Sequence, residues 1–216
     1  MAIIIIISIH IFMDFSLLSN RNKLFWISKR LFDIIISLLL LPLLLIISIF
    51  LLFLNPLYNS GRLVFIQKRM GKNCKAFFAI KFRTMSPIEE ITRKYDEPIE
   101  LDRITPLGRI LRRIRIDELP QILNVLRGDM SLIGPRPDYY VHALEYLKKV
   151  EGYSDRHTIR PGITGLSQVR LGYVESLETI SKKVSIDNYY IQNVGYIIEL
   201  KIIFSTIFVI FRGIGK

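Results

Sequence analysis

Apolar residues gather in a few runs along the chain, and each run predicts a different element. Residues 31–54 form an apolar stretch with a single charged residue, Asp33. Drawn as one straight helix, this stretch would be about 36 Å long, which is enough to cross a bilayer. We assign no function to a shorter apolar run, residues 3–18, which either skims the membrane or lies upstream of a translation start at Met13.

The long apolar stretch has two features that argue against a straight crossing. Pro42 lies near its middle, where proline removes a backbone donor and destabilises a helix by about 3 kcal/mol. Both flanks are basic, whereas the positive-inside rule needs a charge asymmetry to orient a span. A helix that enters the membrane, breaks at Pro42 and returns would keep both ends on the cytoplasmic side. From these residues alone, a kinked single-pass anchor is an equally good interpretation.

The C-terminal segment 197–212 is a further apolar region. Its uncharged part, residues 202–211, is too short to span a bilayer. We therefore expect an amphipathic helix that lies in the membrane interface. An ordinary helix packed against the protein core explains the same residues equally well.

Between these regions, the pattern predicts a small domain that begins with a β-hairpin. Residues 62–67 and 75–82 are rich in β-branched and aromatic side chains, and they flank a turn at residues 71–73. Two such runs around a short glycine-containing turn are typical of paired strands. A polar stretch, residues 86–103, follows the second strand.

Helical patterns dominate the rest of the chain. Thr105 followed by Pro106 is typical of a helix N-terminus, and apolar residues then recur at helical spacing. A second helix is expected to end at Gly128, because glycine readily adopts the left-handed conformation that closes a helix. Two more helices are predicted over residues 138–150 and 181–194.

Composition indicates the kind of partner and excludes some kinds of site. The 216 residues are 50% hydrophobic and carry a formal net charge of +11, so anions are the natural partners. Cys74 is the only cysteine, which excludes a disulfide framework and suits a reducing compartment. The three histidines are scattered without the HExxH spacing of a zinc site. Neither a Walker phosphate loop nor a dinucleotide fingerprint is present.

Candidate chemistry lies in residues 108–121, which read GRILRRIRIDELPQ. One predicted helix presents several arginines, of which the first three share a broad face by their offsets of three and four residues: Arg109, Arg112, Arg113 and Arg115. Asp117 and Glu118 follow just before Pro120, which is tolerated only in the first turn of a helix. Both carboxylates are therefore expected at the start of the next helix, beside the arginines.

This arrangement suits phosphate chemistry. A helix N-terminus carries unpaired N–H groups and partial positive charge, and arginine binds phosphate through two hydrogen bonds. An anionic aspartate that attacks a phosphate needs that charge neutralised, by arginine and by Mg²⁺. Arg136 and Arg160, each next to a proline, would add rigid phosphate clamps. The competing interpretation is an ordinary N-cap with surface salt bridges.

Several segments resemble one family, the bacterial sugar transferases, or monotopic polyprenyl-phosphate phosphoglycosyl transferases. In chain order they read KRLFDIIISLLLLPLLL, FIQKRMGKN, IKFRTM, LGRILRRIRIDELPQILNVLRGDMSLIGPRP, RPGITGLSQV, IDNYYIQN and LKIIFSTI. The resemblance runs from Lys29 to near the end of the chain, and the block from DELPQ to GPRP is long and specific.

The resemblance implies a reaction and a set of site residues. Asp117 would attack the sugar-bearing phosphate of a UDP-sugar and release UMP. The covalent aspartyl phosphosugar would then pass to a polyprenyl (undecaprenyl) phosphate, which initiates cell-surface glycoconjugate synthesis. Glu118 would assist, and both carboxylates are the candidate ligands of Mg²⁺. The residues expected to bind substrate phosphates are Lys81, Arg112, Arg113, Arg136 and Arg160.

The resemblance also implies an architecture, an α-rich α+β fold with a small β-hairpin and interfacial amphipathic helices. We predict an N-terminal extension over residues 1–28, a re-entrant membrane helix hairpin over 29–57, and a cytosolic helical catalytic domain over 58–216. The protein is expected in the bacterial inner membrane with this domain on the cytoplasmic face. The family breaks its membrane helix at a Ser-Pro pair, which here is Leu41-Pro42. The segment 170–173 also departs from the family, which leaves the sugar open.

Two other interpretations remain. The first is a non-catalytic basic membrane-surface protein that binds anionic lipid or nucleic acid, since each basic residue near an anionic leaflet contributes about 1 kcal/mol. The aromatic and basic spacing of an RNA-binding module is absent, so we expect no nucleic-acid partner. The second keeps the enzyme class and changes the nucleotide-activated donor.

Overall fold

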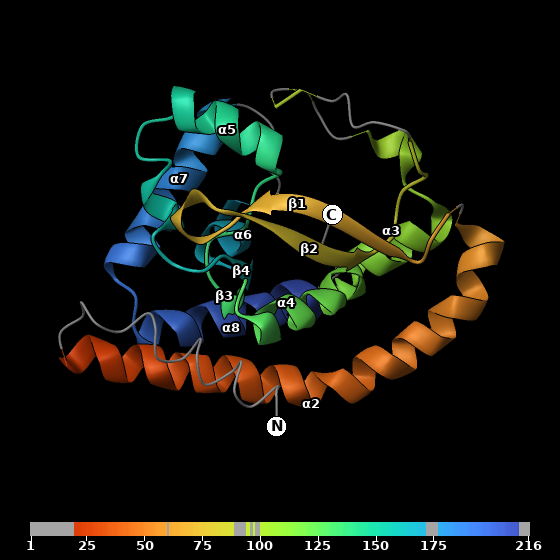
Figure 1. Ribbon diagram of the computed structural model, residues 1–216, viewed down its shortest axis with the longest axis horizontal. Coiled ribbons are helices and arrows are strands. Elements are labelled where there is room, and N and C mark those ends of the chain that lie inside the picture. The colour runs from red at the N-terminus through yellow and green to blue at the C-terminus, as the bar shows by residue number, and fades with distance from the viewer. Residues whose placement is uncertain are drawn as a thin grey trace.

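The computed structural model describes residues 20–59, 61–88, 94–95, 97, 100–171 and 177–211. Helices dominate, which confirms the predicted α-rich fold, and Figure 1 shows the longest helix curving beneath the rest of the domain. In chain order, with η for 3-10 helices, the elements are α2 (Asn20–Tyr58), β1 (Val64–Met70), η1 (Lys72–Cys74), β2 (Ala76–Phe82), η2 (Leu101–Arg103), α3 (Pro106–Arg113), η3 (Ile116–Gln121), α4 (Ile122–Arg127), β3 (Ser131–Ile133), α5 (Tyr140–Lys149), η4 (Asp155–His157), β4 (Gly162–Thr164), α6 (Leu166–Leu171), α7 (Leu177–Gln192) and α8 (Tyr196–Phe211).

The predicted β-hairpin is confirmed. Strands β1 and β2 pair antiparallel, from Val64 opposite Phe82 to Met70 opposite Ala76. The turn between them contains Asn73 and Cys74, which have φ angles of 54° and 57°. Figure 1 shows the hairpin crossing the middle of the domain, so that its residues reach both α3 and α5.

A second sheet was not predicted. Strands β3 and β4 pair parallel, with Ser131 opposite Gly162 and Ile133 opposite Thr164. The pairing needs glycine at close quarters, because a Cβ added to Gly162 would lie 2.1 Å from the backbone nitrogen of Gly134. It brings the loop of residues 134–137 beside the loop of residues 160–162. Strands of three residues carry no usable periodicity, which is why the sequence pattern missed them.

The helix boundaries largely follow the sequence signals. Thr105 Oγ1 accepts a hydrogen bond of 2.9 Å from the backbone N–H of Gly108, so the predicted N-cap of α3 is confirmed. Gly128, with φ 92°, closes α4 as predicted. Helix α3 ends at Arg113, however, and Arg115 adopts a left-handed conformation with φ 60°. The prediction that one helix presents Arg115 with the other arginines is therefore wrong, because this residue turns the chain into η3.

Helix α2 stays helical across Pro42, so the break expected at that position is not seen. Leu44 and Leu51 pack into one apolar cluster with Phe82, Leu107 and other residues of the domain, so the second half of the helix is held against the domain. The helix follows a gentle curve (Figure 1). By length and composition, Lys23–Tyr58 is the one described helix that could cross a membrane, and an 18-residue window within it has a mean hydropathy of 3.2. Its re-entrant course through a bilayer stays a prediction, and residues 1–19 lie outside the described chain.

Polar contacts also attach α2 to the domain. Lys29 Nζ lies 2.7 Å from a carboxylate oxygen of Glu199 on α8, and both side chains are buried. Arg30 donates to the carbonyl oxygens of Val125 and Leu126 at the end of α4, at 2.7 and 3.2 Å. The backbone N–H of Leu132 donates to Asp33. The first half of α2 is therefore fixed to α4, β3 and α8, so the helix packs as part of the domain rather than as a separate anchor.

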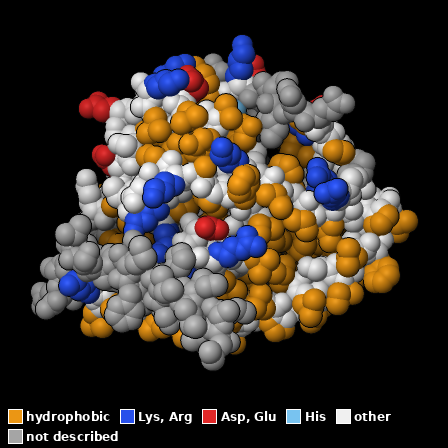
Figure 2. Space-filling model, viewed as in Figure 1, with side chains coloured by type: hydrophobic (Ala, Val, Ile, Leu, Met, Phe, Trp, Pro, Cys, Tyr) orange, Lys and Arg blue, Asp and Glu red, His pale blue; other side chains and the backbone are white. Residues whose placement is uncertain are grey.

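Helices α2 and α8 leave apolar side chains exposed on their outer faces. Leu39 is 69% exposed on α2, and Ile197 and Phe204 are 73% and 68% exposed on α8. Figure 2 shows apolar side chains over the C-terminal half of α2, at the lower right. Ile202, on the inner side of α8, is fully buried against Ile133 and neighbouring core residues. Helix α8 is therefore a core helix on one face and an exposed apolar helix on the other.

Candidate active site

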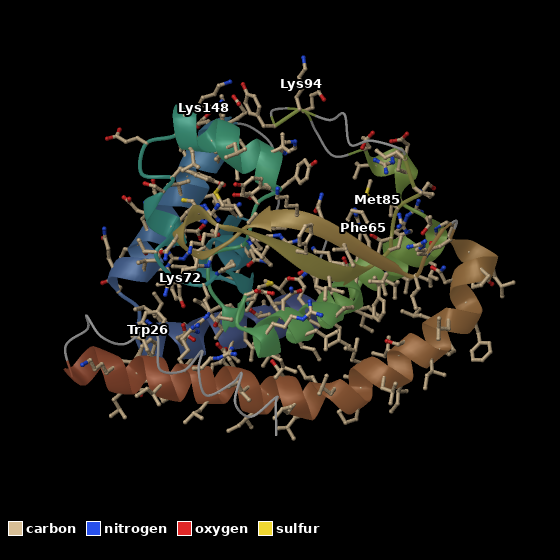
Figure 3. The ribbon with its side chains drawn as sticks, in the orientation of Figure 1. Trp26, Phe65, Lys72, Met85, Lys94 and Lys148 are labelled. Atoms are coloured by element: carbon tan, nitrogen blue, oxygen red, sulfur yellow. The ribbon has the colours of Figure 1, made fainter. Side chains whose placement is uncertain are left out.

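A cavity of about 360 Å³ lies between the β-hairpin, η3, the loop of residues 134–137 and helices α5, α6 and α7. Phe65 and Met85, both labelled in Figure 3, are among the residues that line it. Five of the predicted site residues line this cavity although they come from four separate segments: Lys81, Arg112, Asp117, Glu118 and Arg136. The structure thus brings most of the predicted site residues together in one cavity.

The two carboxylates lie in the first turn of η3, which leads directly into α4. The left-handed Arg115 starts this turn, and its carbonyl oxygen accepts a hydrogen bond from the backbone N–H of Glu118. Asp117 and Glu118 are only 7% and 5% exposed. Burial of two adjacent carboxylates is unfavourable without positive partners, so the cations around them decide their protonation states.

Glu118 is held by two cations. Lys81 Nζ lies 2.7 Å from Glu118 Oε1, and Arg136 donates to the same oxygen at 2.5 Å and to Oε2 at 3.1 Å. Burial alone would raise the pKa of Glu118, but the charges of Arg136 and Lys81 lower it well below its usual range. Burial also lowers the pKa of Lys81 from 10.5 to about 8, against the opposing charge of Glu118. Glu118 is therefore a fixed anion that orients Arg136 and Lys81.

Asp117 is in the opposite situation. Its Oδ1 is buried and has no hydrogen-bond partner among the described residues. Burial, and then the neighbouring charge of Glu118, raise the pKa of Asp117, while Lys81 and Arg112 partly oppose this shift. Arg112 is itself oriented by a 2.9 Å hydrogen bond from its Nε to Thr84. An unpartnered buried oxygen is unfavourable for folding, which is typical of a group that acts on a ligand.

The same oxygen fits a divalent cation better than Glu118 does. Mg²⁺ is usually held by one or two carboxylates together with water and substrate phosphates. Asp117 Oδ1 is available for such a contact, whereas both oxygens of Glu118 already bind Lys81 or Arg136. Among the described residues, no group of three His, Cys, Asp or Glu side chains could hold a metal without a substrate.

A buried charge network supports the loop that carries Arg136. Arg156, 1% exposed, donates from Nη2 to the carbonyl oxygen of Arg136 at 2.7 Å. It also forms ion pairs with Asp138 and, at 2.8 Å, with Asp187. Lys183 Nζ lies 2.5 Å from the other oxygen of Asp138. The sequence pattern gave no signal for this network, because its members lie on three separate elements.

Two predicted phosphate ligands lie elsewhere. Arg160 Nε donates to the carbonyl oxygen of Gly128 at 2.8 Å, so this side chain caps the C-terminal end of α4. Arg113 is exposed on α3. Neither residue is among those lining the cavity in the described part of the chain. Their sequence positions suggested a shared site, but the helical rotation of α3 and the parallel pairing of β3 with β4 direct them away from it.

Sequence reasoning also missed two polar residues of the cavity, Ser167 and Gln168 of α6. Ser167 Oγ and Gln168 Oε1 are buried and have no hydrogen-bond partner among the described residues, as is the case for Asp117 Oδ1. Both lie within the segment RPGITGLSQV, but serine and glutamine in a short helix carry no chemical signal of their own.

Comparison with known proteins places this site in context. The sequence profile described as "Bacterial sugar transferase" matches residues 24–213. The chain is 37% identical over 188 residues to the UDP-N-acetylgalactosamine-undecaprenyl-phosphate N-acetylgalactosaminephosphotransferase of Aeromonas hydrophila, covering 87% of this chain and 44% of that protein. It is also 37% identical over 192 residues to the UDP-glucose:undecaprenyl-phosphate glucose-1-phosphate transferase of Klebsiella pneumoniae, covering 88% of this chain and 41% of that one.

These two relatives are long proteins, and the chain spans less than half of their length. A shorter relative is the exopolysaccharide production protein PSS of Rhizobium leguminosarum bv. phaseoli. The two are 40% identical over 192 residues, which covers 83% of this chain and 92% of the relative. The matching region therefore corresponds to nearly a whole protein in one case and to one part of a larger protein in the others.

Proposed function

The chain belongs to the bacterial sugar transferase family, and on that premise we propose that it transfers a sugar-1-phosphate from a UDP-sugar to undecaprenyl phosphate. The names of two relatives support the donor and acceptor classes. The observation that carries the proposal is the buried, unpartnered Oδ1 of Asp117 in a cavity that also holds Lys81, Arg112 and Arg136. A carboxylate among three cations is suited to attack on a phosphate.

In the first step, a carboxylate oxygen of Asp117 forms a bond to the phosphorus that carries the sugar. The bond from this phosphorus to the bridging oxygen breaks, and the electron pair leaves with UMP. Arg136, Lys81 and Arg112 offset the negative charge that accumulates as an anion approaches an anion. Glu118 holds Arg136 and Lys81 in place for this task.

In the second step, a phosphate oxygen of the polyprenyl phosphate attacks the same phosphorus. The bond to Asp117 breaks and returns the carboxylate, and the product is a polyprenyl diphosphate sugar. We propose that Asp117, with the donor phosphates, holds a Mg²⁺ ion, which when bound would neutralise phosphate charge. Glu118 serves this arrangement through its two cations.

We also propose that the protein lies in the bacterial cytoplasmic membrane, with the cavity on the cytoplasmic side and α2 as a re-entrant helix. The exposed apolar faces of α2 and α8 and the basic residues that flank the apolar run support this placement. Single cysteines introduced by Lys23→Cys and Lys148→Cys in a Cys74→Ser background would both resist an impermeant thiol reagent added to intact cells. Labelling of either cysteine from outside the cell would contradict this placement.

The experiment that tests the reaction traps its intermediate. Purified protein is mixed with Mg²⁺ and a UDP-sugar, without acceptor, and both UMP and the mass of the peptide carrying Asp117 are measured. We expect about one UMP per active protein and one phosphosugar on Asp117. Adding undecaprenyl phosphate should remove the adduct and allow continuous UMP release. If UMP were released only after undecaprenyl phosphate is added and no adduct appeared at any time, the transfer would be direct and Asp117 would not be the nucleophile.

A further inference from the structure

The reaction proposed above uses Asp117 and the cations around it, and it leaves two polar groups of the cavity unexplained. Ser167 is only 2% exposed, and its Oγ has no hydrogen-bond partner among the described residues. Gln168 Oε1 is likewise buried and unpartnered. Both residues line the same cavity as Asp117. Two adjacent unpaired groups in a cavity wall are unfavourable for folding unless a ligand pairs with them.

The orientation of Gln168 is fixed by the protein. Its Nε2 donates to the carbonyl oxygen of Ile163 at 3.1 Å, so the amide presents only its acceptor oxygen to other partners. Serine, by contrast, offers a hydroxyl that both donates and accepts. The pair therefore suits a ligand that carries neutral hydroxyl groups. It does not suit a phosphate, because an acceptor oxygen repels an anion.

These groups lie close to the loop of residues 134–137, which carries Arg136, one of the cations proposed above to bind the donor phosphates. The backbone N–H of Gly134 donates to the carbonyl oxygen of Thr164 at 2.8 Å. Gly165 lies against both Gly134 and Gln168, because a Cβ added to Gly165 would be 2.2 Å from the carbonyl oxygen of Gly134 and 3.3 Å from Gln168 Oε1. Gly134 starts the loop that carries Arg136, which binds Glu118 beside Asp117. The sugar is bonded directly to the phosphate that Asp117 would attack, and Ser167 and Gln168 line the same cavity as Asp117, so a donor bound there can bring its sugar hydroxyl groups to these two residues.

We propose that Ser167 and Gln168 form the subsite that binds hydroxyl groups of the donor sugar and so determine which sugar is transferred. The inference rests on the proposed function, because it assigns one part of the same donor. A site that hydrogen-bonds a substrate hydroxyl discriminates strongly against an analogue that lacks it, because the buried protein group is then left without a partner.

The test pairs protein variants with donor analogues. Wild type, Ser167→Ala and Gln168→Met are assayed for UMP release with the better of UDP-glucose and UDP-N-acetylgalactosamine, and with analogues of that donor that each lack one sugar hydroxyl. We expect each variant to lose about tenfold in kcat/KM with the complete donor. With the one analogue that lacks the bound hydroxyl, wild type and variant should be nearly equal.

Ser37→Ala is the matched control. Ser37 is fully buried and its Oγ is also unpartnered among the described residues, but it lies on α2 and does not line the cavity. It should leave kcat/KM unchanged for every donor. Both serine variants should keep or raise the melting temperature without ligand, because each removes an unpaired buried hydroxyl. Inhibition by UMP should be unchanged in all variants, since UMP carries ribose but lacks the transferred sugar.

Three results would overturn the inference. One is an equal loss of kcat/KM across all donor analogues, and another is unchanged kcat/KM with every donor. The third is weaker inhibition by UMP, which would assign the pair to the nucleotide. If wild type released no UMP from any UDP-sugar, the proposed function would fail instead. The subsite would then be judged by the rise in melting temperature that a UDP-sugar produces beyond that of UMP, which Ser167→Ala should abolish.

Discussion

Two neighbouring regions of this protein hold aspartates in opposite situations: Asp138 is partly buried and Asp117 is buried. Around Asp138, both carboxylate oxygens receive partners, from Lys183 at 2.5 Å, from Tyr153 at 2.8 Å and from Arg156. Around Asp117, one oxygen has no partner among the described residues. Burial would raise both pKa values, but Lys183 and Arg156 lower that of Asp138 strongly, whereas that of Asp117 stays raised.

The difference distinguishes a structural charge from a reactive one. A carboxylate with complete hydrogen bonding holds its neighbours in place, and here Asp138 orients Arg156, which fixes the loop that carries Arg136. A buried carboxylate with an open oxygen makes the fold less stable. Asp187 Oδ1, in the Arg156 network, is also unpartnered among the described residues, but Asp187 does not line the cavity, so the open oxygen indicates ligand chemistry only at Asp117. Substitution at the two positions should therefore affect different measured quantities.

The largest expected effect is on catalysis at Asp117. Asp117→Asn should lower the rate of UMP release by about 10⁴-fold or more, because the amide is not a nucleophile. The melting temperature should stay the same or rise, since the change removes repulsion with Glu118. Asp102→Asn, at an exposed position, is the matched control and should alter neither quantity. A marked loss of stability in Asp117→Asn would mean that the two aspartates are not different in kind.

The reverse result is expected at Asp138. Asp138→Asn leaves the charges of Arg156 and Lys183 with too little compensation, and it should lower the free energy of unfolding by about 3 kcal/mol. Denaturant unfolding in detergent measures this change, with the exposed Asp155→Asn as the control. An unchanged free energy of unfolding would show that the ion pairs of Asp138 do not stabilise the fold.

A smaller effect links the two regions through Arg136. Arg136→Lys keeps the charge but loses the two hydrogen bonds to Glu118 and the planar contact with phosphate. We expect kcat/KM for the UDP-sugar to fall about 100-fold, with little change in melting temperature. Arg109→Lys, on the exposed side of α3, makes the same chemical change outside the cavity and should have no effect. Equal activity of the two variants would remove Arg136 from the phosphate site.

The smallest effect concerns pH and the edge of the Asp138 network. Burial, and then the charge of Arg156, lower the pKa of His157 from 6.5 to about 3. The folded protein therefore keeps this ring neutral, while the unfolded chain takes up a proton as the pH falls below 6.5. Stability should be lost progressively from pH 6.5 towards pH 3, with a loss from this residue of about 1 kcal/mol at pH 5.5.

His157→Asn is the variant that isolates this contribution. It should weaken the fall in melting temperature between pH 7 and pH 5.5, because the side chain no longer titrates. Activity per folded molecule should be unchanged at pH 7. If the melting temperatures of wild type and variant fall equally between pH 7 and pH 5.5, the histidine is already protonated in the folded protein. The network would then have a different charge balance.

Features that depend on neighbouring residues could be read from the sequence. The hairpin turn at residues 71–73, the Thr105 cap and the glycine stop at Gly128 each follow from the backbone preferences of a few adjacent residues. The adjacent Asp117 and Glu118 were also visible, because the dyad, the preceding arginines and the following proline are contiguous. Local conformational preference is enough to specify such elements.

Tertiary structure alone decided which charges meet. Lys81, Glu118 and Arg136 come from three segments, and only folding makes Glu118 the partner of both cations while leaving an oxygen of Asp117 open. The same holds for the parallel pairing of β3 with β4, which directs Arg160 to the end of α4 and sets Ser167 in the cavity wall. The residue type sets the chemistry that a side chain is capable of. Its burial and its partners depend on contacts distant in the sequence, and burial and partners together determine its protonation state and its reactivity.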